Sequence, residues 1–111
     1  MVMKVEELIE TLGHQDQDVR RGAARSLGEI GEDAKVAVPA LIQAVQQDKH
    51  ARIRAARALG RIGEGAKDAV SALIQALQDQ DQYGRRCVAK ALEKIGTPEA
   101  LKVVEEYQSQ R

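Results

Sequence analysis

The sequence has very few aromatic residues and only one cysteine. Phe and Trp are absent, and Tyr83 and Tyr107 are the only aromatic residues, so Leu, Ile, Val and Ala must fill any hydrophobic core. Cys87 has no second cysteine to pair with, which excludes an intramolecular disulfide and favours a reducing, cytoplasmic location. No apolar run is long enough to span a bilayer, and the first residues lack the apolar stretch of a secretory signal. We therefore expect a cytoplasmic chain without a membrane segment.

The sequence repeats itself with a period of 32 and then 33 residues. Leu27, Leu59 and Leu92 mark the same position in three copies, which read VRRGAARSLGEIG, ARIRAARALGRIG and GRRCVAKALEKIG. Residues 23–44 and 55–76 are identical at 17 positions, as either a recent duplication or a designed sequence would give. Such a period is typical of solenoids, because each unit buries its apolar face only by stacking on its neighbours.

Apolar residues recur at helical spacing in every copy, which predicts an all-α solenoid of about seven helices. We expect three pairs, each with a first helix A and a second helix B, and a terminal capping helix that begins at Pro98 and carries Leu101 and Val104. The expected A helices cover residues 3–12, 34–47 and 66–77, and the expected B helices cover 16–30, 49–62 and 82–95. We expect one domain, residues 1–111, with repeats at about 3–31, 34–63 and 66–96 and a terminal half-repeat at 98–111.

Four positions within these helices have specific predicted roles. Pro39 lies inside an expected helix, so we expect a kink there, with Pro39 opening the main helical segment. Gly28 and Gly60 each follow a core leucine, which predicts that a neighbouring helix approaches closely at that point. Leu59 belongs to the middle copy, and we expect it at the centre of the core.

An aspartate and an arginine four residues apart open each B helix. These pairs are Asp16 and Arg20, Asp48 and Arg52, and Asp81 and Arg85. Their spacing puts both side chains on one helix face, and stacking would align the pairs as a ladder along the solenoid. An exposed ion pair contributes only about 0.3–0.5 kcal/mol, so we expect the ladder to set register and cap helices rather than to add much stability. An acid–base dyad is the less favoured alternative.

The motif D-x-x-x-R-x-x-A-A-x-A-L-G-x-I-G, followed by A-V-P-A-L-I-x-A-L, resembles HEAT-like repeats of the short class related to the phycobilisome-lyase (PBS lyase) repeats. The resemblance covers almost the whole chain, with departures at Ala51, Gly84, Val88 and Glu93. It implies a HEAT/armadillo-like superhelix in which the B helices line the concave surface. The functions that it implies include scaffolds, chaperone-like factors and lyase subunits.

Basic residues are concentrated on the B helices, although the whole chain has no net charge. Residues 16–30, 48–62 and 81–95 hold twelve of the 17 basic residues and six acidic ones, so they carry a formal charge of +6 and the remainder carries −6. Tyr83 lies early in its B helix, where we expect an exposed contact residue on the same concave face or, as the alternative, a residue packed against the adjoining helix. The basic candidates for partner binding there are Arg21, Arg25, Arg54, Arg57, Arg61, Arg86, Lys90 and Lys94. The alternative is that these long side chains only solvate the B helices and cover apolar surface.

The sequence offers no candidate residues for catalysis, for cofactor binding or for metal binding. His14 and His50 have no other His or Cys at ligand spacing, and we expect both at the surface. Arg86 and Lys90 would favour a thiolate at Cys87, but no His lies at helical spacing to act as its base. We also find no phosphate-binding loop and no catalytic triad.

We therefore expect a non-enzymatic scaffold that binds an acidic protein partner through the concave face of its B helices, without a cofactor and without membrane contact. Two alternatives stay open. Nucleic acid could bind the same basic face, although aromatic residues for stacking single strands are lacking. The resemblance also implies a bilin lyase or isomerase-type subunit acting on phycobiliproteins. The sequence indicates no oligomeric state.

Overall fold

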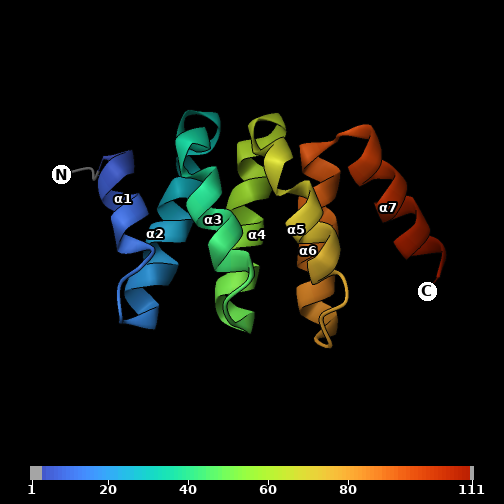
Figure 1. Ribbon diagram of the computed structural model, residues 1–111, viewed down its shortest axis with the longest axis horizontal. Coiled ribbons are helices and arrows are strands. Elements are labelled where there is room, and N and C mark those ends of the chain that lie inside the picture. The colour runs from blue at the N-terminus through green and yellow to red at the C-terminus, as the bar shows by residue number, and fades with distance from the viewer. Residues whose placement is uncertain (1–3, 111) are drawn as a thin grey trace.

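The computed structural model describes residues 4–110, which form two layers of helices (Figure 1). The first layer contains α1 (Val5–Thr11), α3 (Val38–Val45) and α5 (Val70–Ala76), and the second layer contains α2 (Gln17–Ile30), α4 (Lys49–Ile62) and α6 (Gln82–Ile95). The last helix, α7 (Pro98–Ser109), packs against α5 and α6. Two 3-10 segments, η1 (Gly31–Ala37) and η2 (Gly63–Ala69), connect the second layer back to the first. No strand occurs in residues 4–110, and the predicted all-α solenoid is confirmed.

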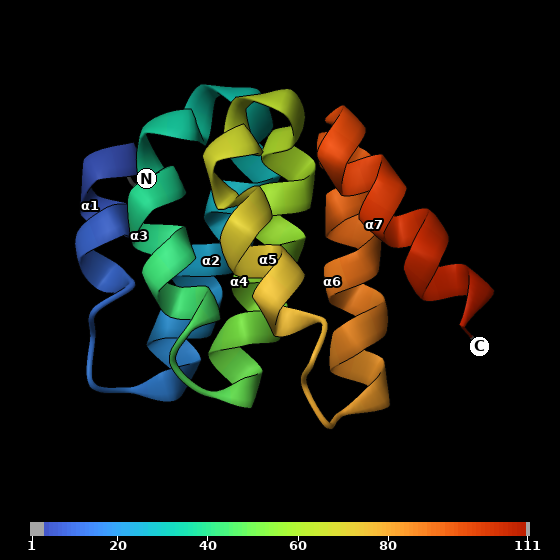
Figure 2. The same cartoon turned by 45° about the vertical axis from the view of Figure 1, so that its right-hand side comes forward.

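The helices stack along one direction and give a body of 45 × 26 × 17 Å. In Figure 2, α3 lies in front of α2 and α5 in front of α4, and α7 slants away from α6. Helix α4 packs along both α2 and α6, whereas α3 and α5 meet over a much smaller contact. The expected helix start at Met3 and the terminal Arg111 lie outside the described residues. None of the described helices is both long and apolar enough to cross a membrane.

Each helix of the second layer begins and ends with the same local chemistry. The side chains of Asp16, Asp48 and Asp81 accept hydrogen bonds from backbone N–H groups of the first turn, which otherwise lack partners. At the other end the helices stop at Gly31, Gly63 and Gly96, whose φ values are 72°, 75° and 74°. A side chain would strain that backbone conformation, so glycine is favoured at these three stops.

The expected kink is displaced: it lies at Ala34 and not directly before Pro39, and proline is not its cause. Ala34 interrupts η1 with φ −96° and ψ 15°, and Pro39 then stands in the first turn of α3. The next repeat has Ser71 at the position of Pro39, yet η2 bends in the same way at Ala66, with φ −100° and ψ 20°. Ala34 and Ala66 have no exposed surface. In both repeats the bend therefore occurs at a completely buried alanine, and it does not require proline.

Leucines without exposed surface run through the whole stack. They are Leu27, Leu41, Leu59, Leu73 and Leu92. Leu59 lies on α4, the helix with second-layer neighbours on both sides, which confirms its predicted central place.

The apolar side of α7 differs from the expected one. Leu101 is 46% exposed, and Ala100 and Val104 form the buried side of the helix. The reason lies in the preceding turn, since Gly96 has ψ 15° where Gly31 and Gly63 have ψ −134°. The chain passes from Gly96 directly into α7 without a 3-10 segment. The side of α7 that packs on the core is therefore not the side that carries Leu101.

The helices of the second layer approach one another most closely at glycine. A Cβ atom added to Gly28 would lie 3.2 Å from Cα of Ala58, and one added to Gly60 would lie 3.1 Å from Cα of Ala91. Both distances are tighter than ordinary contacts and involve backbone that cannot move freely. The predicted role of these two glycines is confirmed.

Truncation of the central leucine should be costly. Leu59→Ala removes a completely buried side chain from the middle of the stack, and we expect it to lower the free energy of unfolding by about 2–5 kcal/mol. Leu92→Ala should cost less, because α6 has a second-layer neighbour on one side only. Leu101→Ala is the control, with an expected change within about 0.5 kcal/mol. Urea unfolding measures all three, and equal midpoints for wild type and Leu59→Ala would contradict the assignment.

The same substitution should have opposite effects at two glycines. Gly60→Ala should lower the free energy of unfolding by about 1–3 kcal/mol, because its methyl group would press on the backbone of α6. Gly22→Ala should raise it by about 0.5–1 kcal/mol, because no atom lies within 4 Å of the new methyl group and alanine is the better helix former. Thermal unfolding followed by circular dichroism would decide the sign of each change.

Candidate functional site

Two grooves lie on the side of the second layer that faces away from the first layer. The first groove lies between α2 and α4 and the second between α4 and α6, with volumes of about 280 and 380 Å³. Gly28 and Ala58 lie in the floor of the first groove, and Gly60 and Ala91 lie in the floor of the second. The absence of large side chains in the floor leaves both grooves open.

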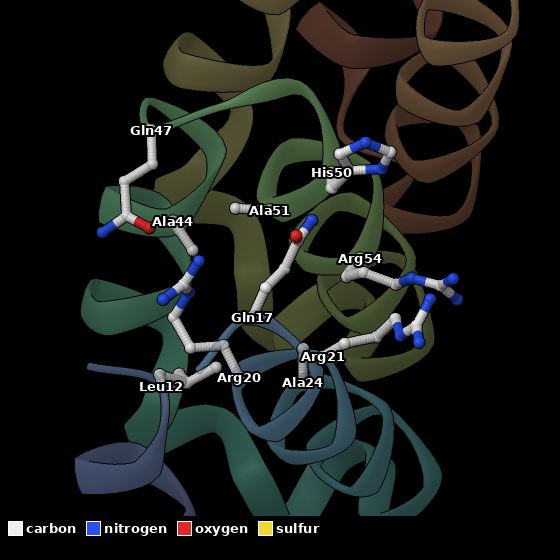
Figure 3. Close-up of a pocket in the computed structure, with 10 residues that line it drawn as sticks. All are labelled: Leu12, Gln17, Arg20, Arg21, Ala24, Ala44, Gln47, His50, Ala51 and Arg54. Carbon is white, nitrogen blue, oxygen red and sulfur yellow. The ribbon is translucent and has the colours of Figure 1, made fainter. Parts of the chain in front are cut away.

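The structure brings the nine predicted binding residues to this face. The first groove is lined by Arg25, Arg54, Arg57 and Arg61, and the second by Arg57, Arg61, Tyr83, Arg86, Lys90 and Lys94. Arg21 lies beside Arg54 in a smaller pocket at the same α2–α4 interface (Figure 3). All of these side chains are exposed except that of Arg54, which is partly buried. We call this set, from Arg21 to Lys94, the basic face.

The positive charge of the basic face is uneven. On α2, Arg21 pairs with Asp18 at 2.9 Å and Arg25 with Glu29 at 3.8 Å. Within residues 4–110, no carboxylate pairs with the six basic side chains of α4 and α6, namely Arg54, Arg57, Arg61, Arg86, Lys90 and Lys94. The expected patch is therefore partly neutralised over α2 and retains its positive charge over α4 and α6.

Arg54 is the most crowded cation of this face. Its partial burial lowers the pKa of the guanidinium, and the charges of Arg21, Arg57 and Arg25 lower that pKa further, against an opposing effect of Tyr83. An arginine side chain stays protonated in proteins, so the folded chain carries this repulsion between like charges. A bound anion would relieve it.

Tyr83 is held at the rim of the second groove by a cation from the neighbouring helix. The Nη2 atom of Arg57 donates a hydrogen bond to the Tyr83 hydroxyl, and Cζ of Arg57 lies 5.7 Å from the centre of the ring. The tyrosine remains 50% exposed. The contact joins α4 to α6 and presents an aromatic surface beside the basic side chains, a combination suited to protein contacts.

The expected ladder of Asp–Arg ion pairs is not found in the described residues. Each aspartate turns to the backbone N–H groups of its own helix start, as a helix cap does. Arg20 donates hydrogen bonds to the carbonyl oxygens of His14 and Gln15, at 2.7 and 2.9 Å, and Arg85 donates to that of Asp79 at 2.7 Å. These two arginines therefore clamp the turn before their own helix, which the spacing of four residues alone could not reveal.

Arg52 makes a contact between repeats that sequence reasoning missed. Its Nη1 atom lies 2.7 Å from Oδ2 of Asp79, and Nε donates to the carbonyl oxygen of Val45 at 3.0 Å. The side chains of Arg52 and Asp79 are 21% and 13% exposed. Asp79 has no acidic equivalent in the other turns, where Gln46 and His14 stand. The occurrence of an acidic residue at this position in only one repeat was the sequence signal that could have indicated this contact.

Several interactions act on the carboxylate of Asp79. Burial alone would raise its pKa, but the hydrogen bonds from the Asp81 N–H and from Arg52, together with the charge of Arg52, lower the pKa below its ordinary value. In the first turn, Nδ1 of His14 accepts a hydrogen bond from the Asp16 N–H in the corresponding way. The turns thus share one geometry with different acceptor groups.

The remaining chemically interesting residues lie apart from one another. Cys87 is a free, partly exposed thiol in the second groove, and His50 lines the smaller pocket of Figure 3. Within residues 4–110, no three His, Cys, Asp or Glu side chains are grouped so that they could hold a metal ion.

Comparison with known proteins gives one family and several engineered structures. A family model described as HEAT repeats matches residues 3–55 and residues 38–110. Three crystal structures of engineered proteins from the Northeast Structural Genomics Consortium are similar, with TM-scores of 0.75, 0.72 and 0.71 and identities of 28%, 29% and 29%. They align with 95%, 92% and 92% of this chain, which spans 52%, 50% and 30% of theirs. No curated protein matches the sequence.

Loss of the contact between repeats should be visible as a pH effect. Asp79→Asn should lower the free energy of unfolding at neutral pH by about 1–3 kcal/mol, because a hydrogen-bonded ion pair is lost. Since the folded-state pKa of Asp79 is lowered, its contribution is complete above the unfolded-state value of about 3.9 and disappears as the pH falls through the folded-state value. The difference between variant and wild type in urea unfolding should therefore shrink at about pH 3. A difference that stays constant with pH would contradict this role.

Proposed function

The chain belongs to the HEAT-repeat family, and from that premise we propose that it is a non-enzymatic interaction scaffold that binds an acidic segment of a protein partner on its basic face. The observation that carries the proposal is the set of six cations on α4 and α6 that have no carboxylate partner among the described residues. They line open grooves, so an extended segment could reach several of them at once. Complementary charge would also speed the encounter of the two proteins.

The spacing of the helices supports a concave shape for this face. Glycine–alanine contacts bring α2, α4 and α6 close together, whereas α3 and α5 contact each other less. A stack that is tighter in one layer bends toward that layer. We infer that the basic face is the inner surface of the curve, where a partner meets side chains from three helices.

We assign the chain, as part of the same proposal, to the short class of PBS lyase HEAT-like repeats. The period of 32 and 33 residues supports this assignment, as does a division into repeats at about 3–31, 34–63, 66–96 and 98–111. We also propose a cytoplasmic location, since the free thiol of Cys87 suits a reducing compartment. A lyase-type activity rests on that class alone, and no arrangement of described residues favours it.

Nucleic acid is the second candidate partner, because unpaired arginines and lysines also bind phosphates. The only aromatic residue on the basic face is Tyr83, which gives a single stacking platform. The carboxylates of Asp18 and Glu29 at the edge of the face would repel a phosphate backbone. We therefore favour an acidic protein segment.

The test compares two probes on a charge-reversed variant. A fluorescently labelled Glu-rich peptide and a labelled single-stranded oligonucleotide are titrated with the protein, and fluorescence anisotropy reports binding at about 50 and 200 mM salt. We expect the peptide to bind wild type and Arg54→Glu with Arg57→Glu to weaken it at least about tenfold, because attraction is replaced by repulsion. The melting temperature should stay within a few degrees, since Arg57 is exposed, Arg54 is only partly buried and no carboxylate of the described residues pairs with either.

The control places the same charge change on the segments that connect the two layers. Lys35→Glu with Lys67→Glu reverses two exposed lysines on η1 and η2 and should leave peptide affinity close to wild type. Equal weakening by both double variants would show a response to net charge and not a site. Preferential binding of the oligonucleotide would favour the second candidate, and failure of both probes to bind wild type would refute the proposal.

A further inference from the structure

The smaller pocket between α2 and α4 carries an inference that rests on the proposed function and adds a specificity to it. We propose that this pocket, shown in Figure 3, anchors one aliphatic side chain of the bound acidic segment, next to a carboxylate that pairs with Arg54. The partner would then be recognised by an aliphatic residue beside an acidic one, and not by charge alone.

The floor of the pocket is apolar. It is formed by Leu12, Ala24, Ala44 and Ala51, which come from the end of α1 and from α2, α3 and α4. Leu12, Ala24 and Ala44 are among the buried residues of the core, with 7%, 3% and 6% of their surface exposed. An entering aliphatic group would therefore contact the core itself.

The rim of the pocket is cationic. Arg21 and Arg54 extend toward the same side of the opening, and Arg20 extends toward Gln47 on the other side (Figure 3). Arg20 is already bonded to carbonyl oxygens of the preceding turn, and Arg21 is paired with Asp18. Of the three rim arginines, Arg54 has neither a carboxylate partner nor a side-chain hydrogen bond within residues 4–110, and its neighbours repel it. A carboxylate beside the aliphatic group would meet this one charge.

The next interface along the stack shows why the pocket is unusual. The position of Arg21 on α2 is taken on α4 by Ile53, which is 8% exposed. The position of Arg20 is taken by Arg52, which is joined to Asp79 across the interface. Between α2 and α4, an exposed Arg21 stands at the position of this buried isoleucine, and Arg20 makes no such bridge. A pocket at the next interface is lined by Arg52, Ala76 and Gln80, the counterparts of Arg20, Ala44 and Gln47, but it has no counterpart of Arg21 or Arg54.

The size of the pocket limits its occupant. The pocket is partly open, and its volume is about 20 Å³, somewhat more than the roughly 10–15 Å³ that one water molecule needs on the same measure. This space suits the branched end of a leucine side chain. Burial of two methyl groups corresponds to about a tenfold gain in affinity.

The experiment separates the anchor from the charge. Two labelled Glu-rich peptides with amidated C-termini differ only in a central leucine or serine, so that every carboxylate comes from a side chain and the net charge is equal. Anisotropy titrations of wild type should give about tenfold tighter binding of the leucine peptide. Ala51→Leu, which fills the pocket without a change of charge, should abolish this preference and leave the affinity for the serine peptide unchanged.

Two further variants complete the test. Ala72→Leu makes the same change at a partly exposed position of α5 and should keep the preference. Arg21→Ile copies the residue of the next interface and should abolish the preference as well, which provides the same test if Ala51→Leu does not fold. Circular dichroism establishes folding of each variant.

The outcomes distinguish this inference from the proposed function. Equal binding of both peptides to wild type, still weakened by Arg54→Glu with Arg57→Glu, would overturn the anchor and leave the basic face in place. A preference that survives in Ala51→Leu or in Arg21→Ile would likewise overturn it. Binding of neither peptide would refute the proposed function, and the anchor with it.

Discussion

The structure depends on the contact between a glycine and an alanine of adjacent second-layer helices. Gly28 meets Ala58, and Gly60 meets Ala91, so closely that even a methyl group on either glycine would press on the backbone of the next helix. This contact fixes the spacing of α2, α4 and α6, and it draws the second layer closer together than the first. Because these residues are small, they leave the floor of each groove open, and the long basic side chains form its sides. Fold and basic face thus share one cause, since the residues that pack the helices also shape the surface.

Within residues 4–110, the glycine–alanine pattern changes on the sides of α2 and α6 that have no second-layer helix next to them. Ser26 holds the position of Ala58 on α2, which has no described second-layer helix before it, and Glu93 holds the position of Gly60 on α6, which has none after it. Both residues retain contact with solvent. Small apolar residues stand at these positions where two second-layer helices meet, and polar residues stand there otherwise. The sequence therefore encodes the packing pairwise, as expected for a solenoid in which each repeat contacts only its neighbours.

Much of this fold could be predicted from the sequence, because period, caps and core residues are local signals. The aspartate caps, the glycine stops and the buried Leu59 lie at repeated positions and follow from local physical chemistry. The prediction of an Asp–Arg ladder was wrong, because the spacing of two residues does not determine whether their side chains pair with each other or bond to the backbone. The sequence was sufficient to predict which basic residues share one layer, but the neutralisation of those on α2 depends on side-chain geometry. The Arg52–Asp79 bridge and the pocket of Figure 3 depend on contacts between repeats, which a single copy does not contain.

The two interfaces of the second layer therefore differ in more than sequence. The ion pair of Arg52 and Asp79 joins the repeats on the α4–α6 side, whereas Arg21 lines a small pocket on the α2–α4 side. In a solenoid the stability is close to a sum of terms from each repeat and each interface, so one interface can give up packing while the others hold the stack together. A ligand that spans the α2–α4 interface would contact two repeats and stabilise the folded pair. Binding at the proposed site would thus be coupled to the rigidity of the stack.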